Sequence, residues 1–233
     1  MNKGLIYIVT GAKKYIDECI FSAKSFKSQC PDIPVTLFTD NNSIQESCFD
    51  NVNLISDSIH PWKIKVKYLL NSPYKYTLFM DSDTQVVQPI YELFSYLDDH
   101  DLAVAPGPSV DRSSQPPTLL NYIGKGNYNT GVLLYKRSKR TNQFLSKWLE
   151  MIMIEDDDRL LGNWSDQTFF NKLIKSNYHI KCNVKIQTFS NKLYNVRPVM
   201  IEDLKKNGEL SKAKIFHVHN LKNKQYRIQE IIG

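Results

Sequence analysis

Apolar runs alternate with segments of helical periodicity through the first half of the chain. Residues 5–10 form a near-continuous run of β-branched and aromatic side chains, which is typical of a strand covered on both faces. Apolar residues recur at helical spacing from Tyr15 to Phe26, and a second apolar run follows at 35–39. The order strand, helix, strand predicts a βαβ unit with parallel strands.

The alternation continues along the remaining chain. Further strands are predicted at 52–55, 76–80, 102–105, 128–135 and 215–218, and further helices at 62–70, 89–97, 142–154 and 165–174. Residues 106–126 are rich in Pro, Gly and Ser and lack periodicity, so we expect a long loop of the kind that forms lids and binding loops. The pattern predicts an α/β sandwich around a mainly parallel, mixed sheet, and we expect residues 1–233 to form one domain.

Charge and cysteine content narrow the class of protein. Lysine and arginine number 30 against 24 acidic residues, and a net charge of +6 suits anionic partners such as a phosphorylated small molecule, nucleic acid or an acidic membrane surface. The four cysteines form no C-x-x-C pair, and no apolar run approaches membrane-spanning length. The apolar run at 5–9 is too short for a signal peptide, so we expect a protein of the reducing cytoplasm.

Polar residues stand at the ends of three predicted strands. Thr10 and Gly11 follow the first strand, Asp40 follows the second, and Asp81-Ser82-Asp83 follows the strand at 76–80. Ligands of parallel sheets gather at the carboxyl ends of the strands, so these residues are expected to share one crevice.

Three D-x-D triplets occur, and their positions distinguish them. Asp81 and Asp83 come directly after a strand, where two carboxylates repel each other unless a cation neutralises them, and hard oxygen ligands suit Mn²⁺ or Mg²⁺. The alternative for this pair is a turn that caps the strand. The triplets at 99–101 and 156–158 lie in charge-rich stretches, for which a solvated surface is expected.

Four motifs in order carry a resemblance to a known family. They are Tyr-Thr-Leu-Phe-Met-Asp-Ser-Asp-Thr at 76–84, Asn-Thr-Gly-Val-Leu-Leu at 129–134, the pair Asp166-Gln167, and Ile-Phe-His at 215–217. In this order the chain resembles the GT-A nucleotide-sugar glycosyltransferases, most closely the glycogenin-like and bacterial lipooligosaccharide galactosyltransferase group, which is glycosyltransferase family 8. The resemblance covers nearly the whole chain and implies the GT-A fold, a Rossmann-like α/β/α sandwich.

The resemblance implies a metal site of two acids and an imidazole. In such enzymes Asp81, Asp83 and His217 would hold a divalent cation, Mn²⁺ or Mg²⁺, that bridges the diphosphate of the donor. His219 lies two residues beyond His217 on the same face of a predicted strand, so the sequence leaves either histidine open as the ligand.

The resemblance also assigns residues to the donor. The expected substrate-binding residues are Thr10, Gly11, Tyr15, Lys65, Asp81, Ser82, Asn129, Thr130 and Gly131, and the expected catalytic residues are Asp166 and Gln167 beside the anomeric carbon. Some of these residues have a structural alternative. Tyr15 also fits a core-facing position of its helix, and Lys65 also fits a solvated basic helix face. Residues 129–131 could instead form a turn, and Asp166 could instead be an acid that complements the dipole of its helix.

We therefore expect a metal-dependent glycosyltransferase that moves a sugar from a nucleoside-diphosphate donor, a UDP-sugar, to a hydroxyl of a carbohydrate or other acceptor. The group that the chain resembles implies retention at the anomeric carbon. One alternative is a nucleotidyltransferase that makes nucleotide sugars, but such proteins carry a glycine-rich loop after the first strand and this chain has the single Gly11 there. Another is a non-catalytic protein that binds sugar nucleotides or nucleic acid. No groove-reading motif supports nucleic acid.

The C-terminal segment departs from the family pattern. Residues 221–226 replace the lysine-proline-tryptophan segment that often follows the late histidine, which leaves open whether Lys222 or Lys224 contacts the diphosphate. The lysine-rich stretch at 205–227 allows at most peripheral contact with a membrane. The sequence leaves the donor sugar, the acceptor and the oligomeric state open.

Overall fold

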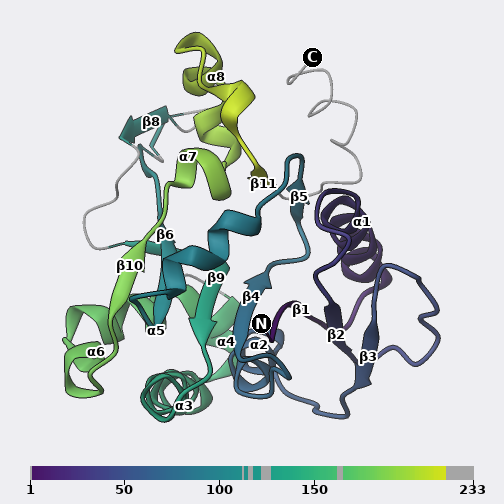
Figure 1. Ribbon diagram of the computed structural model, residues 1–233. Coiled ribbons are helices and arrows are strands. Elements are labelled where there is room, and N and C mark those ends of the chain that lie inside the picture. Colours follow the sequence, from purple (N-terminus) through teal and green to yellow (C-terminus); the bar gives the residue numbers. More distant parts are fainter. Residues whose placement is uncertain (1, 112, 115–117, 122–126, 162–164, 219–233) are drawn as a thin grey trace.

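A seven-stranded mixed sheet runs through the middle of the fold (Figure 1). The computed structural model describes residues 2–111, 113–114, 118–121, 127–161 and 165–218. In the order of the sheet, the strands are β10 (Ile186–Thr188), β6 (Leu102–Pro106), β9 (Tyr128–Lys136), β4 (Tyr76–Met80), β1 (Lys3–Val9), β2 (Val35–Thr39) and β3 (Asn51–Leu54). Only β9 runs antiparallel to its neighbours, β4 and β6, and the other pairs are parallel. The predicted mainly parallel, mixed sheet is confirmed.

Helices cover both faces of the sheet. They are α1 (Lys13–Gln29), α2 (Pro61–Leu69), α3 (Lys139–Met153), α4 (Asp157–Leu161), α5 (Asp166–Lys175), α6 (Tyr178–Lys181), α7 (Asn191–Tyr194) and α8 (Pro198–Lys206), with 3₁₀ turns η1 (Tyr91–Leu97) and η2 (Leu210–Lys212). Successive side chains of a strand point to opposite faces. In β4, Leu78 and Met80 therefore join the core beneath α1 and η1, whereas Phe79 joins the core beneath α2, α3 and α5. This arrangement is the predicted α/β/α sandwich.

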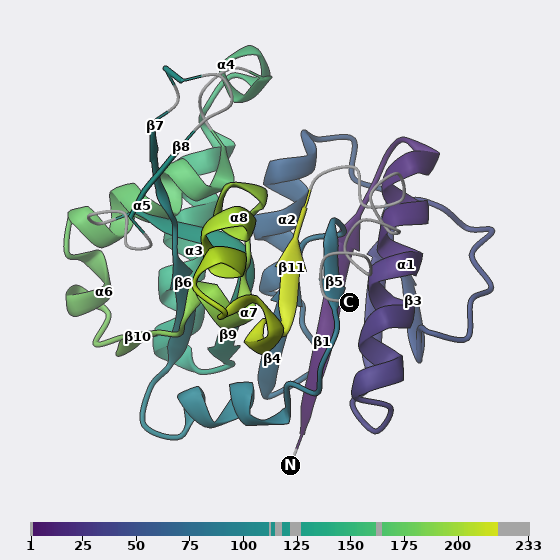
Figure 2. The ribbon, with the colours of Figure 1, turned by 90° about the horizontal axis from the view of Figure 1, so that it is seen from above.

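A short two-stranded ribbon stands apart from the main sheet. Strand β5 (Thr84–Val86) pairs antiparallel with β11 (Ile215–His217), and Figure 2 shows the two side by side between α8 and α1. In their register, His217 lies opposite Thr84. A residue from the end of the described chain is thereby brought beside the turn that follows β4.

Several boundaries differ from the sequence prediction. Part of the expected loop at 106–126 is a hairpin of β7 (Ser109–Asp111) and β8 (Thr118–Asn121), and its other residues are partly outside the described chain. The hairpin forms because Leu119 finds apolar partners in the cluster around α8. The predicted helix at 89–97 is a 3₁₀ helix that begins at Tyr91. No helix in the described ranges is long and apolar enough to cross a bilayer.

Asp101 has a structural role that the sequence did not indicate. The D-x-D triplet at 99–101 was expected on a solvated surface, but Asp101 is buried. Its Oδ1 accepts a hydrogen bond from Nε of Arg140 at 2.8 Å, and its Oδ2 accepts one from the Lys185 backbone N–H at 2.9 Å. The carboxylate thus ties the start of β10 to the start of β6 and to α3. The neighbouring Asp99 is exposed, as predicted.

We expect the Asp101→Ala substitution to lower the free energy of unfolding by about 2–4 kcal/mol, because it leaves the Lys185 N–H without its acceptor and removes the buried partner of Arg140. Urea denaturation measures the change. The matched control is Asp99→Ala, which alters an exposed acid two residues away and should change the same quantity by less than about 0.5 kcal/mol. Equal effects of the two substitutions would contradict this structural role.

Candidate functional site

A pocket of about 710 Å³ lies at the carboxyl ends of β1 and β4. The predicted site residues that line it are Thr10, Tyr15, Lys65, Asp81, Ser82, Asp83 and Asp166. They come from β1, α1, α2, the β4–β5 turn and α5, which are separated by long stretches of sequence. Of the strand ends predicted to share a crevice, those at Thr10 and at Asp81-Ser82-Asp83 line this pocket, whereas Asp40 does not.

Two carboxylates and an imidazole converge at one end of this pocket. Nε2 of His217 lies 3.1 Å from Oδ1 of Asp83 and 3.6 Å from Oδ2 of Asp81. The backbone brings them together: the Asp81 N–H donates to the Gly131 carbonyl at 2.8 Å, and the Val218 N–H donates to the Asp83 carbonyl at 2.9 Å. His219, the alternative ligand, lies outside the described residues.

Gly131 is required by the close approach of these groups. A Cβ atom at this position would lie 2.0 Å from Cε1 of His217 and 2.7 Å from Oδ2 of Asp81, well inside van der Waals contact. Both neighbours are held in place, so neither can move aside without disturbing the cluster. The glycine therefore serves packing around the cluster, and the turn proposed for residues 129–131 is not formed, because all three belong to β9.

Lys65 joins the cluster to a third carboxylate. Its Nζ lies 3.0 Å from Oδ1 of Asp81 and 2.9 Å from Oδ2 of Asp166. Burial opposes the charge of this ammonium, but Asp166 and Asp81 outweigh burial and hold the pKa of Lys65 above its usual value. The alternative of a solvated basic helix face is wrong for Lys65, which is buried.

The residues present fit a divalent cation. The ligand atoms of Asp81, Asp83 and His217 all lie within 4.8 Å of one another. Adjacent ligands of an octahedral Mg²⁺, at 2.0–2.1 Å from the ion, are separated by about 3 Å, which is close to the spacing seen here. Lys65 contacts two of the three carboxylates here, Asp81 and Asp166, so among the described residues the carboxylates outnumber this ammonium, and a divalent cation would offset part of their negative charge.

Asp166 and Gln167 begin α5 beside the start of β9. The hydroxyl of Thr130 donates to Oδ2 of Asp166 at 2.8 Å, and the side-chain amide of Asn129 donates to Oε1 of Gln167 at 2.9 Å. Ser165 is the N-cap of α5, as the sequence predicts. The structure thus brings together residues of β9 and α5 that were predicted to surround the donor sugar. Asn129 and Gln167, for example, are 38 positions apart in the sequence.

The other end of the pocket is aromatic and more open. Tyr15 is 43% exposed, so it is not the core residue that its helical spacing also allowed. Gly11 has φ +87°, a conformation that glycine adopts without strain, and its N–H donates to Oδ2 of Asp40 at 2.9 Å. His60 and Trp62, at the start of α2, also line the pocket. Their position before Lys65 was the only sequence signal for them.

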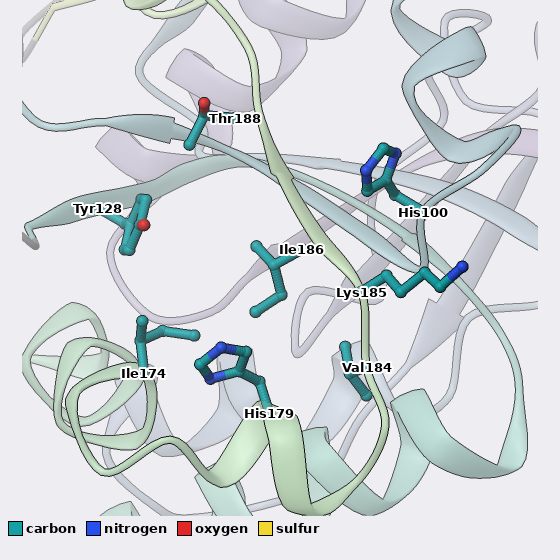
Figure 3. A pocket seen from close by; sticks show the side chains of 8 residues that line it. All are labelled: His100, Tyr128, Ile174, His179, Val184, Lys185, Ile186 and Thr188. Atoms are coloured by element: carbon teal, nitrogen blue, oxygen red, sulfur yellow. The ribbon is translucent and has the colours of Figure 1, made fainter.

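A second hollow of about 390 Å³ lies elsewhere, along the edge strand β10 (Figure 3). Ile186 stands near its centre, with His179 and Tyr128 on one side and His100 on the other. None of the predicted site residues lines it. It is therefore not the candidate active site.

Asn195 is the residue near the cluster that sequence reasoning missed. Its Oδ1 lies 2.9 Å from Nδ1 of His217, and its side chain is fully buried. The segment that contains it has no periodicity or motif that would have drawn attention to a single asparagine.

Glycosyltransferases are among the solved structures with a similar fold. The glycosyltransferase GlyE of Streptococcus pneumoniae TIGR4 has a TM-score of 0.61 and 16% identity over 92% of this chain and 54% of its own, so this chain spans about half the length of GlyE. Mouse xyloside xylosyltransferase 1 has a TM-score of 0.59 and 14% identity, over 94% of this chain and 98% of its own. The galactosyltransferase LgtC, in complex with donor and acceptor sugar analogs, has a TM-score of 0.55 and 14% identity, over 99% of this chain and 95% of its own.

Sequence comparison identifies the family. A search of curated proteins found no match. The family model for nucleotide-diphospho-sugar transferases matches residues 70–227, which is more than half of the chain and includes the Asp81-Ser82-Asp83 turn, the strand β9 and the late histidine. The family favours the transferase over the two alternatives that the sequence left open. The chain belongs to the nucleotide-diphospho-sugar transferase family, and its fold is that of the GT-A glycosyltransferases.

Proposed function

We propose that the protein is a metal-dependent, retaining glycosyltransferase that transfers the sugar of a UDP-sugar to a hydroxyl of a carbohydrate or other acceptor and releases UDP. The observation that carries the proposal is the cluster of Asp81, Asp83 and His217 at one end of a pocket whose other end is aromatic. A nucleoside diphosphate has the same two-part character, with a charged diphosphate and a flat base.

The acidic end suits the diphosphate only with a cation. Asp81, Asp83 and His217 would hold Mn²⁺ or Mg²⁺, which neutralises the diphosphate and acts as a Lewis acid on the leaving group. Without a cation, carboxylates would repel the phosphates. Lys65 and Ser82 line the same end, and the fixed ammonium of Lys65 adds positive charge where negative charge develops as the sugar departs.

The open end suits the base. Tyr15 offers an exposed ring at the start of α1, and Thr10, immediately before Gly11, lines the same pocket at the end of β1. Gly11, which has no side chain, lets a nucleotide approach the backbone closely. Trp62 presents a second aromatic ring to the pocket.

The sugar would lie between β9 and α5. In the proposal, Asn129, Thr130 and Gly131 bind the donor sugar, and Asp166 and Gln167 flank its anomeric carbon. Inversion needs a carboxylate that is available as a base for the acceptor. Of the carboxylates described at this end, Asp166 is engaged by Lys65 and Thr130 and the other two belong to the cluster, which supports retention.

We place the reaction in the cytoplasm within a single domain that comprises residues 1–233. All four cysteines are free and buried, which suits a reducing compartment. We expect no nucleic-acid partner for the protein and at most peripheral contact with a membrane.

A thermal-shift panel tests the donor class. The melting temperature is measured with UDP, GDP, ADP and CDP, each with and without Mn²⁺. Ligands that bind the folded protein raise its melting temperature. We expect the melting temperature to rise most with UDP and Mn²⁺ together. In a separate assay, we expect the protein to hydrolyse a UDP-sugar only when Mn²⁺ is present. A rise that is equal with and without Mn²⁺ would count against the metal site.

The Asp83→Ala substitution should lower kcat/KM for donor hydrolysis by on the order of 10²-fold or more, because it removes a ligand of the cation that stabilises the departing diphosphate. The matched control is Asp158→Ala, which changes an exposed acid of another D-x-D triplet. Turnover of the Asp83 variant close to that of the control would remove the cluster from the mechanism.

The Tyr15→Ala substitution should weaken UDP binding about tenfold or more, with a smaller effect on kcat, because base stacking on an aromatic ring contributes about 1–3 kcal/mol. Isothermal titration calorimetry with UDP and Mn²⁺ measures the affinity. Tyr91→Ala removes a tyrosine that is also exposed and lies in η1, and should leave the affinity unchanged. If both variants bind UDP alike, the base does not stack on Tyr15.

The released sugar reports the stereochemistry. With an α-linked UDP-sugar as donor, ¹H NMR during the first minutes of hydrolysis should show the α-anomer, because retention keeps the configuration at the anomeric carbon. Initial release of the β-anomer would show inversion and would require a catalytic base that the proposal does not include.

A further inference from the structure

A chain of side-chain amides runs from β9 to the imidazole of the cluster. The Gly131 backbone N–H donates to Oδ1 of Asn129 at 3.1 Å, Nδ2 of Asn195 donates to the same oxygen at 2.9 Å, and Oδ1 of Asn195 lies 2.9 Å from Nδ1 of His217. Asn195 and His217 are buried, at 0% and 2% exposure. Solvent therefore does not compete for the contact between Asn195 and His217.

The direction of every hydrogen bond in this chain follows from its first member. A backbone N–H can only donate, so the atom of Asn129 that faces Gly131 is the carbonyl oxygen. That oxygen can only accept, so Asn195 must present its NH₂ group to it. The carbonyl oxygen of Asn195 is then the atom that faces His217, and the ring nitrogen opposite it, Nδ1, must carry a proton.

We infer that Asn195 is a positioning residue for the proposed metal ligand His217: it holds the proton on Nδ1 and so directs the Nε2 lone pair toward Asp81 and Asp83. A metal binds the unprotonated nitrogen of an imidazole, and the group that binds the other nitrogen determines the tautomer and the ring orientation. The effect of Asn195 on metal affinity rests on the proposed function, whereas the position of the proton does not.

The contact between Asn195 and His217 is necessary because Asp83 competes for the proton of the imidazole. Oδ1 of Asp83 lies 3.1 Å from Nε2, close enough to accept a hydrogen bond from a proton there. In the absence of Asn195, the neutral ring would place its one proton on Nε2 and donate it to Asp83. The nitrogen needed for the cation would then be occupied.

The same series of hydrogen bonds extends to the proposed sugar site. Since Oδ1 of Asn129 faces Gly131 and Asn195, its NH₂ group faces outward and donates to Oε1 of Gln167 at 2.9 Å. The amide nitrogen of Gln167 therefore points away from Asn129. One backbone N–H of β9 thus fixes the orientation of His217 at one end and of Gln167 at the other.

The experiment reads the Nδ1 proton of His217 directly by ¹H–¹⁵N NMR, in metal-free protein at a pH that keeps the ring neutral. Comparison with His217→Gln identifies the signal. We expect wild-type protein to show a proton on Nδ1 that exchanges slowly with water, and Asn195→Ala to lose it. Wild-type protein with an unprotonated Nδ1, or an Asn195→Ala variant that keeps the slowly exchanging proton, would overturn the inference.

A second variant keeps the test valid if Asn195→Ala does not fold, and it separates the two hydrogen bonds that Asn195 makes. Asn195→Asp has nearly the same size and keeps an acceptor oxygen for Nδ1, but it cannot donate to Asn129. We expect it to retain the Nδ1 proton signal. Loss of that signal in a folded Asn195→Asp protein would also overturn the inference.

Mn²⁺ affinity, measured by electron paramagnetic resonance titration, provides the functional readout. Asn195→Ala should weaken Mn²⁺ binding by about 10- to 100-fold, as loss of a group that orients a metal ligand does. The matched control is Asn191→Ala, which removes another buried asparagine from the same segment, one whose amide donates to the Pro106 carbonyl. It should lower stability without changing the Nδ1 proton or Mn²⁺ affinity, and equal losses of Mn²⁺ affinity in both variants would overturn the inference.

Failure of the proposed metal site can be told apart from failure of this inference. If Asp83→Ala binds Mn²⁺ as wild-type protein does, the proposed metal site is wrong, and the NMR result still decides whether Asn195 holds the proton on Nδ1.

Discussion

The repulsion among three carboxylates, two that follow β4 and one at the start of α5, is the constraint on which the rest of the site depends. The buried ammonium of Lys65 contacts Asp81 and Asp166, whereas Asp83 lies against the imidazole of His217. Buried charges of one sign are costly unless they are paired, so each surrounding element has to supply either a compensating charge or a hydrogen bond. Helix α2 supplies Lys65, β9 supplies Thr130, and β11 supplies His217. The remaining negative charge is the physical reason to expect a divalent cation.

The β5–β11 ribbon makes this arrangement possible. The main sheet alone would place the acids at a strand end with only the neighbouring strands beside them. By pairing with β11, β5 brings His217 opposite Thr84, and the hydroxyl of Thr84 donates to the Asp81 carbonyl at 2.8 Å. Ser22 and Tyr7 continue this contact into the core, with 2.7 Å between successive hydroxyl oxygens. The turn that carries the acids is thus held from both the ribbon and the core.

Sequence reasoning predicted what depends on local pattern and on motif order. The apolar runs identified β1, β2, β4 and β9, because strands buried on both faces have a continuous apolar pattern. The motif order led to the cluster, since β4 and β11 each carry a recognisable polar ending. The burial of Asp101 could not be predicted, because an acidic residue is buried only where partners from distant segments meet it, here Arg140 and Lys185. Asn195 was missed for the same reason: its partners are 22 and 66 residues away in the sequence.

The two ends of the pocket differ in how tightly their side chains are held, and this difference has a consequence for function. At the acidic end, Asp83, Asp166 and His217 are buried and bonded to neighbours on several elements, so a change at any of them disturbs the others. At the aromatic end, Gly11 and Tyr15 are exposed. A site that must stabilise charge developing in a transition state gains from fixed dipoles and charges, because they need no reorganisation during the reaction. A site that only binds a base can tolerate adjustable contacts. If the proposed function holds, the rigid part would serve the chemistry, and the exposed part would be where the choice of nucleotide can change without loss of the reaction.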